Sequence, residues 1–305
     1  MRTLQRLNIR CVEHLCRQLG CTEKELWGFY LHPEAWYWRS QITVKGKVRP
    51  IVRPIGQFYA VSKKLGALLS RIALPPYLHG GVKGRSPRTN ALIHIGKAAI
   101  LKFDLQDFFP RIRPGQVYRL FEGRLGCSRI VARVLTRLVT LDGGLPQGSP
   151  TSTIVANLVI VPLAGRLNGL ATSHGSDYSQ FVDDGAISGP AYLERLRPLV
   201  EKIIHQEGFR ASPKPHKRLT LYWHQEQVVT GVKVNRRIDV PREKVEEVSA
   251  LLDAADAKVR SVQGLSEKEI HSLAGKIQHI KNLNRSRGTT LGKRFADLIS
   301  MPAPR

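Results

Sequence analysis

Three carboxylates at the ends of predicted strands constrain the fold more than any other feature of the sequence. Residues 99–103 form an apolar run that ends in Asp104, a pattern typical of a buried strand. Residues 178–188 are predicted to form a β-hairpin with Asp183 and Asp184 at its tip. If this pair converges on Asp104, the like charges repel one another and require cations between them.

Carboxylate oxygens are ligands for hard cations, so the three aspartates predict a site for two Mg²⁺ ions, with Mn²⁺ as the alternative. Two such ions about 3.5–4 Å apart are the usual device for in-line phosphoryl transfer. One ion lowers the pKa of an attacking hydroxyl, and the other stabilises a triphosphate and its leaving pyrophosphate. Taken alone, an Asp-Asp pair is more often a solvated turn.

The charge of the chain narrows the class of partner. The 305 residues include 48 Lys and Arg against 24 Asp and Glu, a formal charge of +24. Such an excess favours a polyanionic partner over a basic protein without a specific ligand, and its spread along the chain favours nucleic acid over a membrane. No apolar stretch approaches the ~18 residues of a spanning helix, and neither a secretory signal nor a CxxC pair occurs. We therefore expect a cytoplasmic protein without a membrane partner.

Predicted strands and helices are mixed without regular βαβ alternation, which indicates an α+β fold with an antiparallel sheet. Helices are expected over residues 1–40 and 58–72, from Ser128, from Ser152 and over 196–204. The proline-containing residues 45–54 are expected to form extended edge strands or a hairpin. After Val240 the pattern is helical throughout. Pro241 is expected at the first position of one helix, and Ser266 with Glu269 is predicted to form the capping box of another.

Three motifs occur in the order and with the separations found in reverse transcriptases, which the chain resembles. Residues 103–109 (FDLQDFF) resemble the first catalytic motif, and residues 144–150 (GLPQGSP) with Asn157 the second. Residues 181–184 (FVDD) resemble the third. Any one of them is a weak signal, whereas the ordered set is a strong one.

Elements around these motifs narrow the resemblance to retron reverse transcriptases. Residues 90–94 (NALIH) resemble the Asn-Ala-x-x-His element of that family, and residues 229–231 (VTG) its Val-Thr-Gly element. Residues 80–86 (GGVKGRS) are similar to the loop that precedes the first of these. Group II intron and defence-associated reverse transcriptases share the catalytic motifs, so the flanking elements favour retrons over them.

The resemblance implies a right-hand polymerase fold. Fingers are expected over residues 1–95 with a contribution from 115–145, a palm with an antiparallel sheet over 96–240, and a helical thumb over 241–305. Asp104, Asp183 and Asp184 would be catalytic and would hold the metal ions.

The resemblance also implies roles for residues around the aspartates. Expected nucleotide-binding residues are Lys45, Lys47, Arg49, Phe109, Gln147, Gly148 and Lys217. Among these, a ring at Phe109 would exclude a ribose 2′-OH, unless it is simply a core residue, and Lys217, with Lys214 as second candidate, would protonate the leaving pyrophosphate. Expected nucleic-acid contacts are Arg85, Asn90, His94, Lys281, Arg285 and Arg287. For His94 a buried hydrogen-bonding role is the alternative, and for the basic residues a solvated face.

Two departures from the family pattern concern the catalytic region. Phe181 replaces the usual Tyr and Val182 a common Ala, although the β-branched Val182 is still expected to fit a strand. Residues 211–215 (ASPKP) are rich in proline, which weakens the assignment of the nearby lysine.

The function implied is that of an RNA-directed DNA polymerase. It would use dNTPs to copy part of a cognate structured non-coding RNA into single-stranded DNA, primed from an RNA 2′-OH to give branched RNA–DNA (msDNA) in anti-phage defence. Further partners would be an effector protein and host RNase H, since 305 residues leave no room for a nuclease unit. The alternatives are a non-retron defence or group II intron-like reverse transcriptase, or an RNA-binding scaffold with dispensable catalysis.

Overall fold

The computed structural model describes residues 5–44, 46–261 and 264–300. Its strands are β1 (Tyr37–Val44), β2 (Lys47–Pro54), β3 (Ala99–Asp104), β4 (Asp177–Phe181), β5 (Asp184–Gly189), β6 (Thr220–Tyr222), β7 (Val228–Val229) and β8 (Val232–Lys233). All strand pairs within these sheets are antiparallel, and helices lie between and around them. The predicted α+β class with an antiparallel sheet is therefore confirmed.

The helical elements fall into two groups along the chain. Those before residue 241 are α1 (Val12–Leu19), α2 (Glu23–Leu31), η1 (Pro33–Trp36), α3 (Gly56–Leu69), α4 (Pro87–Leu92), α5 (Phe108–Arg111), α6 (Pro114–Arg119), η2 (Leu120–Arg124), α7 (Arg129–Val139), α8 (Ser152–Val159), α9 (Val161–Ser173), η3 (Ala191–Leu196), α10 (Arg197–Gln206) and η4 (Pro215–Lys217). The rest are α11 (Arg242–Arg260), α12 (Glu267–Leu283) and α13 (Arg285–Ile299). The helices predicted from Ser128 and Ser152 are confirmed, and the Ser128 hydroxyl accepts from the Val131 amide at 3.4 Å.

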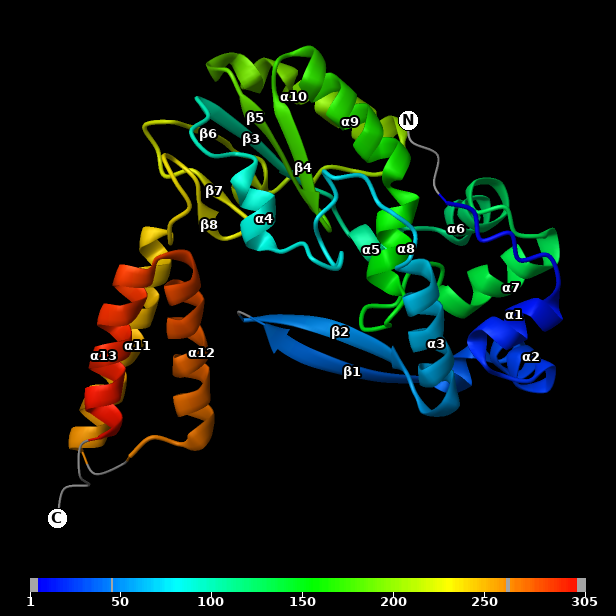
Figure 1. Ribbon diagram of the computed structural model, residues 1–305, viewed down its shortest axis with the longest axis horizontal. Helices are drawn as coiled ribbons and strands as arrows, with labels where there is room; N and C mark the ends of the chain where they lie inside the picture. Colours follow the sequence, from blue (N-terminus) through cyan, green and yellow to red (C-terminus); the bar gives the residue numbers. More distant parts are fainter. Residues whose placement is uncertain (1–4, 45, 262–263, 301–305) are drawn as a thin grey trace.

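The central sheet has the strand order β4-β5-β3-β6 and separates two apolar layers. Because side chains alternate along a strand, Ala99, Leu101 and Phe103 point into the main core, which α8, α9 and α10 also line. Ile100 points to the other face, into a smaller cluster with α4 and the β7–β8 hairpin. Figure 1 shows α9 and α10 along one side of the sheet and α4 on the other.

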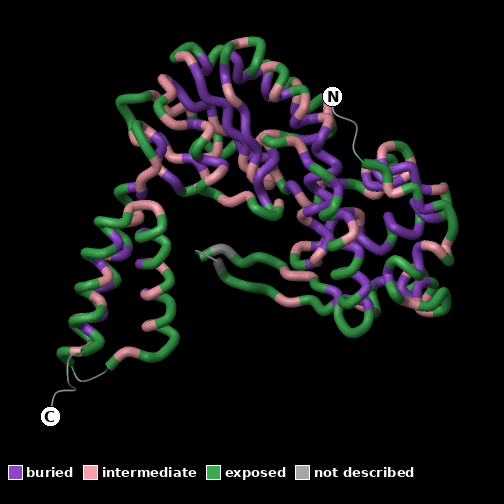
Figure 2. Tube along the Cα trace, in the orientation of Figure 1, coloured by how far each residue is buried: buried purple, intermediate pink, exposed green. Residues whose placement is uncertain are grey.

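The β1–β2 hairpin confirms the extended structure predicted for residues 45–54. Its first strand begins at Tyr37, so the expectation of helix through residue 40 is wrong at its end. Residues 37–40 form strand instead of helix because all eight residues of β1 pair with β2, from Tyr37 opposite Pro54 to Val44 opposite Lys47. The hairpin projects below the central sheet towards the C-terminal helices (Figure 1) and is mostly exposed, in contrast to the buried sheet (Figure 2).

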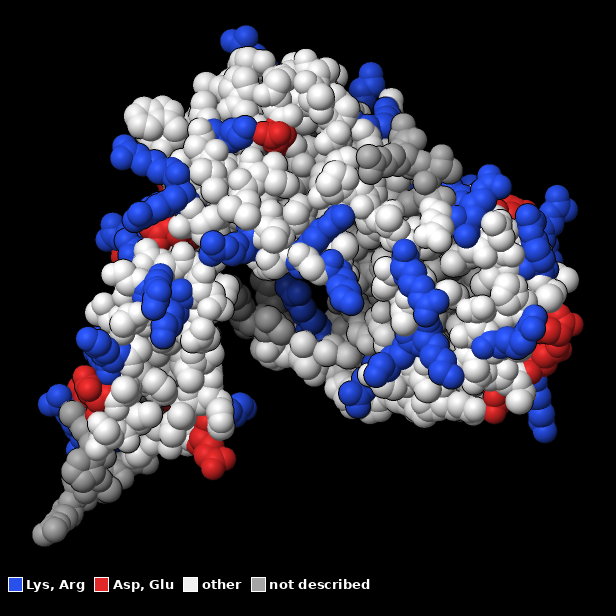
Figure 3. Space-filling model, viewed as in Figure 1, with Lys and Arg blue, Asp and Glu red and all other residues white. Residues whose placement is uncertain are grey.

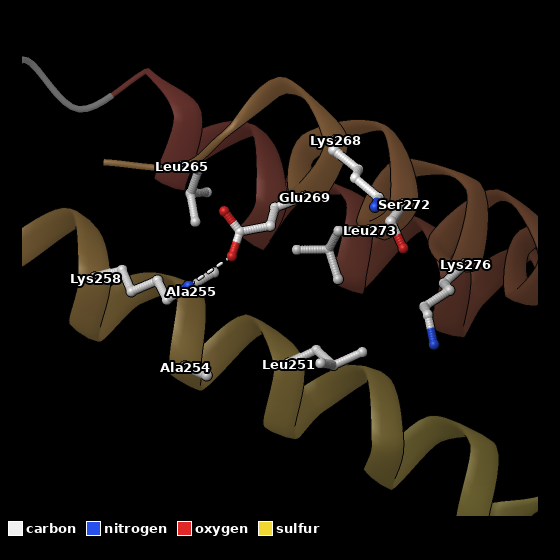
Figure 4. Close-up of a pocket in the computed structure, with 10 residues that line it drawn as sticks. All are labelled: Leu251, Ala254, Ala255, Lys258, Leu265, Lys268, Glu269, Ser272, Leu273 and Lys276. Carbon is white, nitrogen blue, oxygen red and sulfur yellow. Dashed lines mark hydrogen bonds and ion pairs between the residues drawn. The ribbon is translucent and has the colours of Figure 1, made fainter. Parts of the chain in front are cut away.

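The C-terminal unit comprises α11, α12 and α13 and has its own apolar core. The predicted capping box is confirmed, since the Ser266 hydroxyl accepts from the Glu269 amide while the Glu269 carboxylate accepts from the Ser266 amide. Pro241 caps α11 instead of occupying its first position. Helices α11 and α12 leave a groove between them, lined by Leu251, Leu265 and Leu273 among others and crossed by an ion pair from Lys258 to Glu269 at 2.6 Å (Figure 4).

No single helix in the described ranges is long and apolar enough to cross a membrane. The pair α8 and α9, bent by 52°, passes that test only when taken together, by length and composition.

Gly185 offers a test of the central sheet. It lies opposite Phe103, and a methyl group there would come within 2.1 Å of the Phe103 ring. Gly185→Ala should lower the free energy of unfolding by about 1–3 kcal/mol, because the ring must leave its place in the main core. Urea unfolding monitored by circular dichroism measures this.

The matched control is Gly169→Ala in α9, where a methyl group meets nothing within 4 Å. That change should leave stability equal or raise it by about 0.5–1 kcal/mol, since alanine favours helix. Equal effects of the two substitutions would contradict the assigned β3–β5 packing.

Candidate active site

The register of β3 and β5 brings two of the three predicted catalytic carboxylates together. Asp104 ends β3 and lies directly opposite Asp184, the first residue of β5. Residues opposite one another in an antiparallel pair share a face, so both carboxylates lie on the face away from the main core. Asp183 occupies the turn just before β5, and its carbonyl accepts from the Leu105 amide at 2.9 Å. The predicted hairpin with the Asp pair at its tip is thus confirmed.

The turn that carries Asp183 has a strained backbone, which contacts with Gln180 and Gly80 hold in place. Val182 has φ +59°, a left-handed conformation that β-branched residues rarely adopt, so the expectation that it fits a strand is wrong. Its carbonyl accepts from the Gln180 side chain at 2.9 Å. Gly80 packs directly on it, since a methyl group at Gly80 would come within 2.5 Å of the Val182 amide nitrogen. The Gly80 carbonyl in turn accepts from the buried Asn157 side chain at 2.7 Å.

These contacts join segments that the sequence analysis treated separately. The glycine-rich loop supplies Gly80, the second motif supplies Asn157, and the third supplies Val182. Only the resemblance connected Asn157 with the catalytic motifs. Its physical role, holding the loop under the catalytic turn, required the structure.

Lys217 reaches the carboxylates from η4. Its Nζ lies 2.5 Å from Asp104 Oδ2 and 3.6 Å from Asp184 Oδ1. Burial alone would lower the pKa of Lys217, but the hydrogen bond to Asp104 and the charges of the aspartates outweigh it and raise that pKa. Pro215 lies at the start of η4, so the prolines of this segment do not prevent Lys217 from reaching the site. Lys214, the other candidate, caps the same turn and is exposed.

The surroundings of Asp183 and Asp184 disfavour the ionised forms of these two side chains. Desolvation raises the pKa of Asp183 to about 6, and the charges of Asp184 and Asp104 add to the effect. Desolvation also raises the pKa of Asp184, although 46% of its side chain is accessible, and Lys217 opposes that rise. The site therefore concentrates negative charge where positive charge is needed to balance it.

Carboxylate oxygens are the ligand type that a hard divalent cation prefers, so this site fits such an ion in its chemistry but not yet in the spacing of its three side chains. Asp104 and Asp184 face one another, and the ammonium of Lys217 already lies against both. In the residues that the structure describes, no three His, Cys, Asp or Glu side chains are close enough together to hold a metal ion. Asp104, Asp183 and Asp184 would hold the ion, and their metal-binding role stays a prediction.

A second part of the site is an open cleft of about 910 Å³ beside α5. It is lined by Arg53, Pro54, Ile55, Gly56, Tyr59, Lys63, Phe109, Gln147, Gly148, Ser149, Pro150, Ser152 and Thr153. Three predicted nucleotide-binding residues, Phe109, Gln147 and Gly148, thus share one cleft. The Phe109 carbonyl accepts from the Leu145 amide at 3.0 Å, which fixes the first motif against the second.

The β1–β2 hairpin forms the opposite wall of this cleft. The Val52 amide donates to the Gln147 carbonyl at 2.7 Å. Gly148 has φ +117°, and a methyl group on it would lie 3.0 Å from the Ile51 side chain. The glycine is therefore needed for a close backbone approach, as expected, and the approaching backbone is that of the hairpin.

Arg53, Lys63 and Tyr59 are cleft residues that the sequence analysis missed. Arg53 is exposed, and its guanidinium lies 4.8 Å from the centre of the Trp38 ring. The alternation of side chains along a strand could have identified Arg53, because it puts Arg53 on the same face of β2 as Arg49 and Ile51. Arg49 lies nearer the start of β2 than Arg53 and is also exposed. Lys47 is the first residue of that strand, and Lys45 lies outside the described residues.

The predicted nucleic-acid contacts before the first motif are engaged within the protein. His94 is fully buried and hydrogen-bonds to Ser188 at 2.7 Å and Ser179 at 2.7 Å, which is the alternative role expected for it. Burial lowers its pKa to about 4, so the ring is neutral at physiological pH. Asn90, also buried, donates to the Thr230 hydroxyl at 3.4 Å, so the two retron-like elements contact one another. Arg85 donates to the carbonyls of Leu74, Pro75 and Leu78.

The predicted contacts in the C-terminal unit are exposed and gather at the α12–α13 turn. Lys281 lies near the end of α12, and Arg285 and Arg287 lie in the first turn of α13. Asn284 ties this turn to the sheet unit by donating to Asp239 at 2.7 Å. Lys and Arg side chains outnumber Asp and Glu on the face shown in Figure 3.

With this geometry in place, comparison with known proteins identifies the class: the chain is similar to retron reverse transcriptases over most of its length. The resemblance predicted from the motifs is thereby confirmed. No protein-family model matches the chain.

Particular relatives include the retron Mx65 reverse transcriptase of Myxococcus xanthus, 33% identical over 82% of this chain and 61% of the relative. The retron Ec86 reverse transcriptase of Escherichia coli is 31% identical over 67% of this chain and 64% of the relative. The chain thus spans about three-fifths of the length of these two relatives. A telomerase structure from Candida albicans aligns with TM-score 0.47 and 12% identity over 88% of this chain and 61% of the telomerase chain. Because that TM-score is low, the similarity to reverse transcriptases of retrons is based on the sequence comparisons alone.

The pKa of Asp183 predicts a pH-dependent stability in EDTA-treated protein. The folded-state pKa of about 6 exceeds the ordinary value of 3.8, so the folded protein binds this proton more tightly than the unfolded chain does. The resulting stability is present below about pH 4 and is lost as the pH rises through about 6. Asp183→Asn should therefore raise the free energy of unfolding by about 1–3 kcal/mol at neutral pH and change it little below about pH 4.

Urea titrations of both proteins across this pH range measure the difference. Asp297→Asn, which removes an exposed carboxylate from α13, should show no such dependence. A stability difference between wild type and Asp183→Asn that is independent of pH would contradict the assigned environment of Asp183.

Proposed function

We propose that this chain is an RNA-directed DNA polymerase of the retron type. It copies part of a cognate structured RNA into single-stranded DNA, primed from an RNA 2′-OH, and gives a branched RNA–DNA molecule that serves anti-phage defence. In this proposal the central sheet is the palm, the β1–β2 hairpin belongs to the fingers, and α11 to α13 form the thumb. The observation that carries it is the register that sets Asp104 opposite Asp184, with Asp183 in the adjoining turn.

The carboxylates and Lys217 account for the chemistry of nucleotide addition. Divalent metal ions, when bound by the three aspartates, would activate the attacking hydroxyl and neutralise the charge on the transferring phosphate. Lys217, raised in pKa and therefore protonated, lies against Asp104 and can supply a proton to the leaving pyrophosphate. Its reach to both Asp104 and Asp184 keeps the ammonium at the reacting end of the sheet.

The cleft beside α5 accounts for nucleotide binding. Arg53 and Lys63 offer positive charge to a triphosphate, and Gln147 and Gly148 offer backbone close to it. Phe109 is partly buried on the cleft wall, and in this proposal its ring excludes a ribose 2′-OH and so selects dNTPs. These residues are supplied by the first and second motifs, by the hairpin and, for Lys63, by α3.

The RNA, the effector protein and host RNase H are proposed as partners from the similarity to retron reverse transcriptases. A cytoplasmic location is proposed with them, because template removal by a host nuclease takes place there. The rival proposal, an RNA-binding scaffold, does not account for carboxylates gathered on a surface that meets a polyanion. A purely binding surface is weakened by such charges.

Replacing both turn aspartates tests the proposed activity. In cells that express the protein with its flanking non-coding DNA, Asp183→Asn with Asp184→Asn should remove single-stranded DNA while the RNA still co-purifies. The physical reason is that amides bind cations far less well than carboxylates and leave the RNA-binding surfaces intact. Extraction of nucleic acid, followed by RNase and debranching treatment, measures both products.

Asp253→Asn with Asp256→Asn, two carboxylates on α11, is the matched control and should keep the DNA product. A DNA product without a branch would retain the polymerase and reject the retron assignment. The scaffold would be supported if neither wild type nor variant made DNA while both bound RNA.

Phe109 tests the selection of the sugar. Phe109→Ala should raise the incorporation of rUTP relative to dTTP by about 10–100-fold, because the space for a 2′-OH opens while the base and triphosphate contacts remain. Primer extension with each nucleotide separately measures the ratio. Phe209→Leu, which alters a buried ring packed 6.0 Å from Phe108 outside the cleft, should leave the ratio unchanged. An unchanged ratio for Phe109→Ala would assign that ring to packing alone.

A further inference from the structure

A second cleft, of about 890 Å³, lies at the end of the central sheet remote from the catalytic carboxylates. We call it the outer cleft; its charged and aromatic residues are Lys97, Trp223, His224, Glu226, Lys233, Arg236, Arg237 and Asp239. Tyr222, the last residue of β6, pairs with Ala99, whereas Asp104 ends β3 at the opposite end. Five residue steps of antiparallel strand separate the two sites by about 17 Å.

Trp223 is an exposed aromatic ring on a fixed backbone. The residue is 69% exposed, more than any other large hydrophobic residue in the part of the chain that is described. Its amide donates to the Ala98 carbonyl at 2.9 Å, and its carbonyl accepts from the Asn235 side chain at 3.1 Å. The buried Gln227 side chain donates to Lys97 and Leu221, which fixes the following loop. The fold thus holds a largely exposed ring on a fixed backbone, with the edge-on His224 ring 6.1 Å away.

The uncompensated charge of the outer cleft is positive. Glu226 is paired with Lys233 at 3.0 Å, and Asp239 accepts from the Asn284 side chain and the Val240 amide. Lys97 is paired with Asp177 at 2.6 Å. Arg236 and Arg237 are exposed, and neither forms an ion pair with a carboxylate of the described residues. The acidic residues are therefore satisfied within the protein, while two arginines beside the exposed ring are not.

We infer that the outer cleft binds an unpaired stretch of nucleic acid, with a base stacked on Trp223 and the flanking phosphates on Arg236 and Arg237. An aromatic face beside free guanidinium groups is the combination that holds single strands, since every base can stack and every phosphate is charged. The inference rests on the proposed function for the source of that strand, which is either the RNA or the DNA made from it.

The location of the cleft supports a continuous path for nucleic acid. Asn284, in the turn between α12 and α13, contacts Asp239 on the rim of the cleft. The same turn carries Lys281, Arg285 and Arg287, which are exposed. A strand that meets the α12–α13 turn can therefore continue onto the outer cleft without approaching the catalytic carboxylates.

The test uses the full chain with its polymerase channel already filled. The protein is saturated with an unlabelled primer–template duplex, and fluorescein-labelled uridine and thymidine decamers are then titrated by fluorescence anisotropy. The wild type should bind a decamer in addition to the duplex. Trp223→Ala should weaken that binding by roughly 5- to 150-fold, as loss of one stacked base does, whereas Trp223→Phe should retain most of it.

Arg236→Ala with Arg237→Ala tests the phosphate contacts. It should reduce the slope of log affinity against log salt by about 1.4, because two contacts to a single strand are lost. The matched control is Arg10→Ala with Arg133→Ala, which removes the same charge from two exposed positions, one just before α1 and one in α7. All variants should extend an ordinary primer at the wild-type rate, since none touches the carboxylates or the nucleotide cleft.

Tighter binding of the uridine decamer assigns the cleft to RNA, and tighter binding of the thymidine decamer assigns it to the DNA product; both support the inference. Unchanged binding by Trp223→Ala overturns it, as does an equal loss from the Arg10/Arg133 control. If the duplex-filled wild type binds neither decamer, the nucleic-acid assignment fails and the surface is left to a protein partner. Failure of primer extension by the wild type would reject the proposed polymerase, while the decamer titration would still decide the role of the outer cleft.

Discussion

The site depends on the antiparallel register of β3 and β5. That register sets Asp104 opposite Asp184 and turns both carboxylates away from the main core. A shift of one residue would direct them into the core, where an ionised carboxylate is costly. Phe103 packed over Gly185 helps to fix this register, and the buried His94, which bridges Ser179 on β4 and Ser188 on β5, fixes β5 against its other neighbour.

The second motif connects the two parts of the site. At one end its Gln147 carbonyl accepts from Val52 of the hairpin, which closes the nucleotide cleft. At the other, Asn157 holds Gly80 beneath the catalytic turn. The segment between them contains α8, most of which is buried in the main core. The cleft and the carboxylates are therefore positioned from one packed helix, although they are built from residues far apart in the sequence.

Much of the fold followed from local pattern. The apolar run before Asp104, the hairpin around Asp183 and the capping box at Ser266 are short-range signals, and the structure contains all three. Long-range contacts were not predictable in this way. The strand that begins at Tyr37 is set by pairing with β2, and the φ of Val182 by packing against Gly80.

The predicted locations of individual residues were correct for the catalytic motifs and less so for the neighbouring elements. Phe109, Gln147 and Gly148 were named from their motifs, and they meet in one cleft. His94 and Arg85 were named from neighbouring elements, yet their side chains hydrogen-bond within the protein. A motif identifies which residues matter, but it does not tell whether they bind a ligand or hold the residues that do.

The hairpin formed by β1 and β2 has the geometry of a lever. It meets the body of the protein near its base, where Val52 contacts Gln147 and Ile51 contacts Gly148. The hairpin is held to the body at this contact, and most of the hairpin beyond it is exposed (Figure 2). A rotation of the hairpin about this contact would move Arg49 further than Arg53, because Arg53 lies next to the contact. In such a rotation Arg53 would keep nearly the same distance from the cleft, while Arg49 would move with the exposed part of the hairpin.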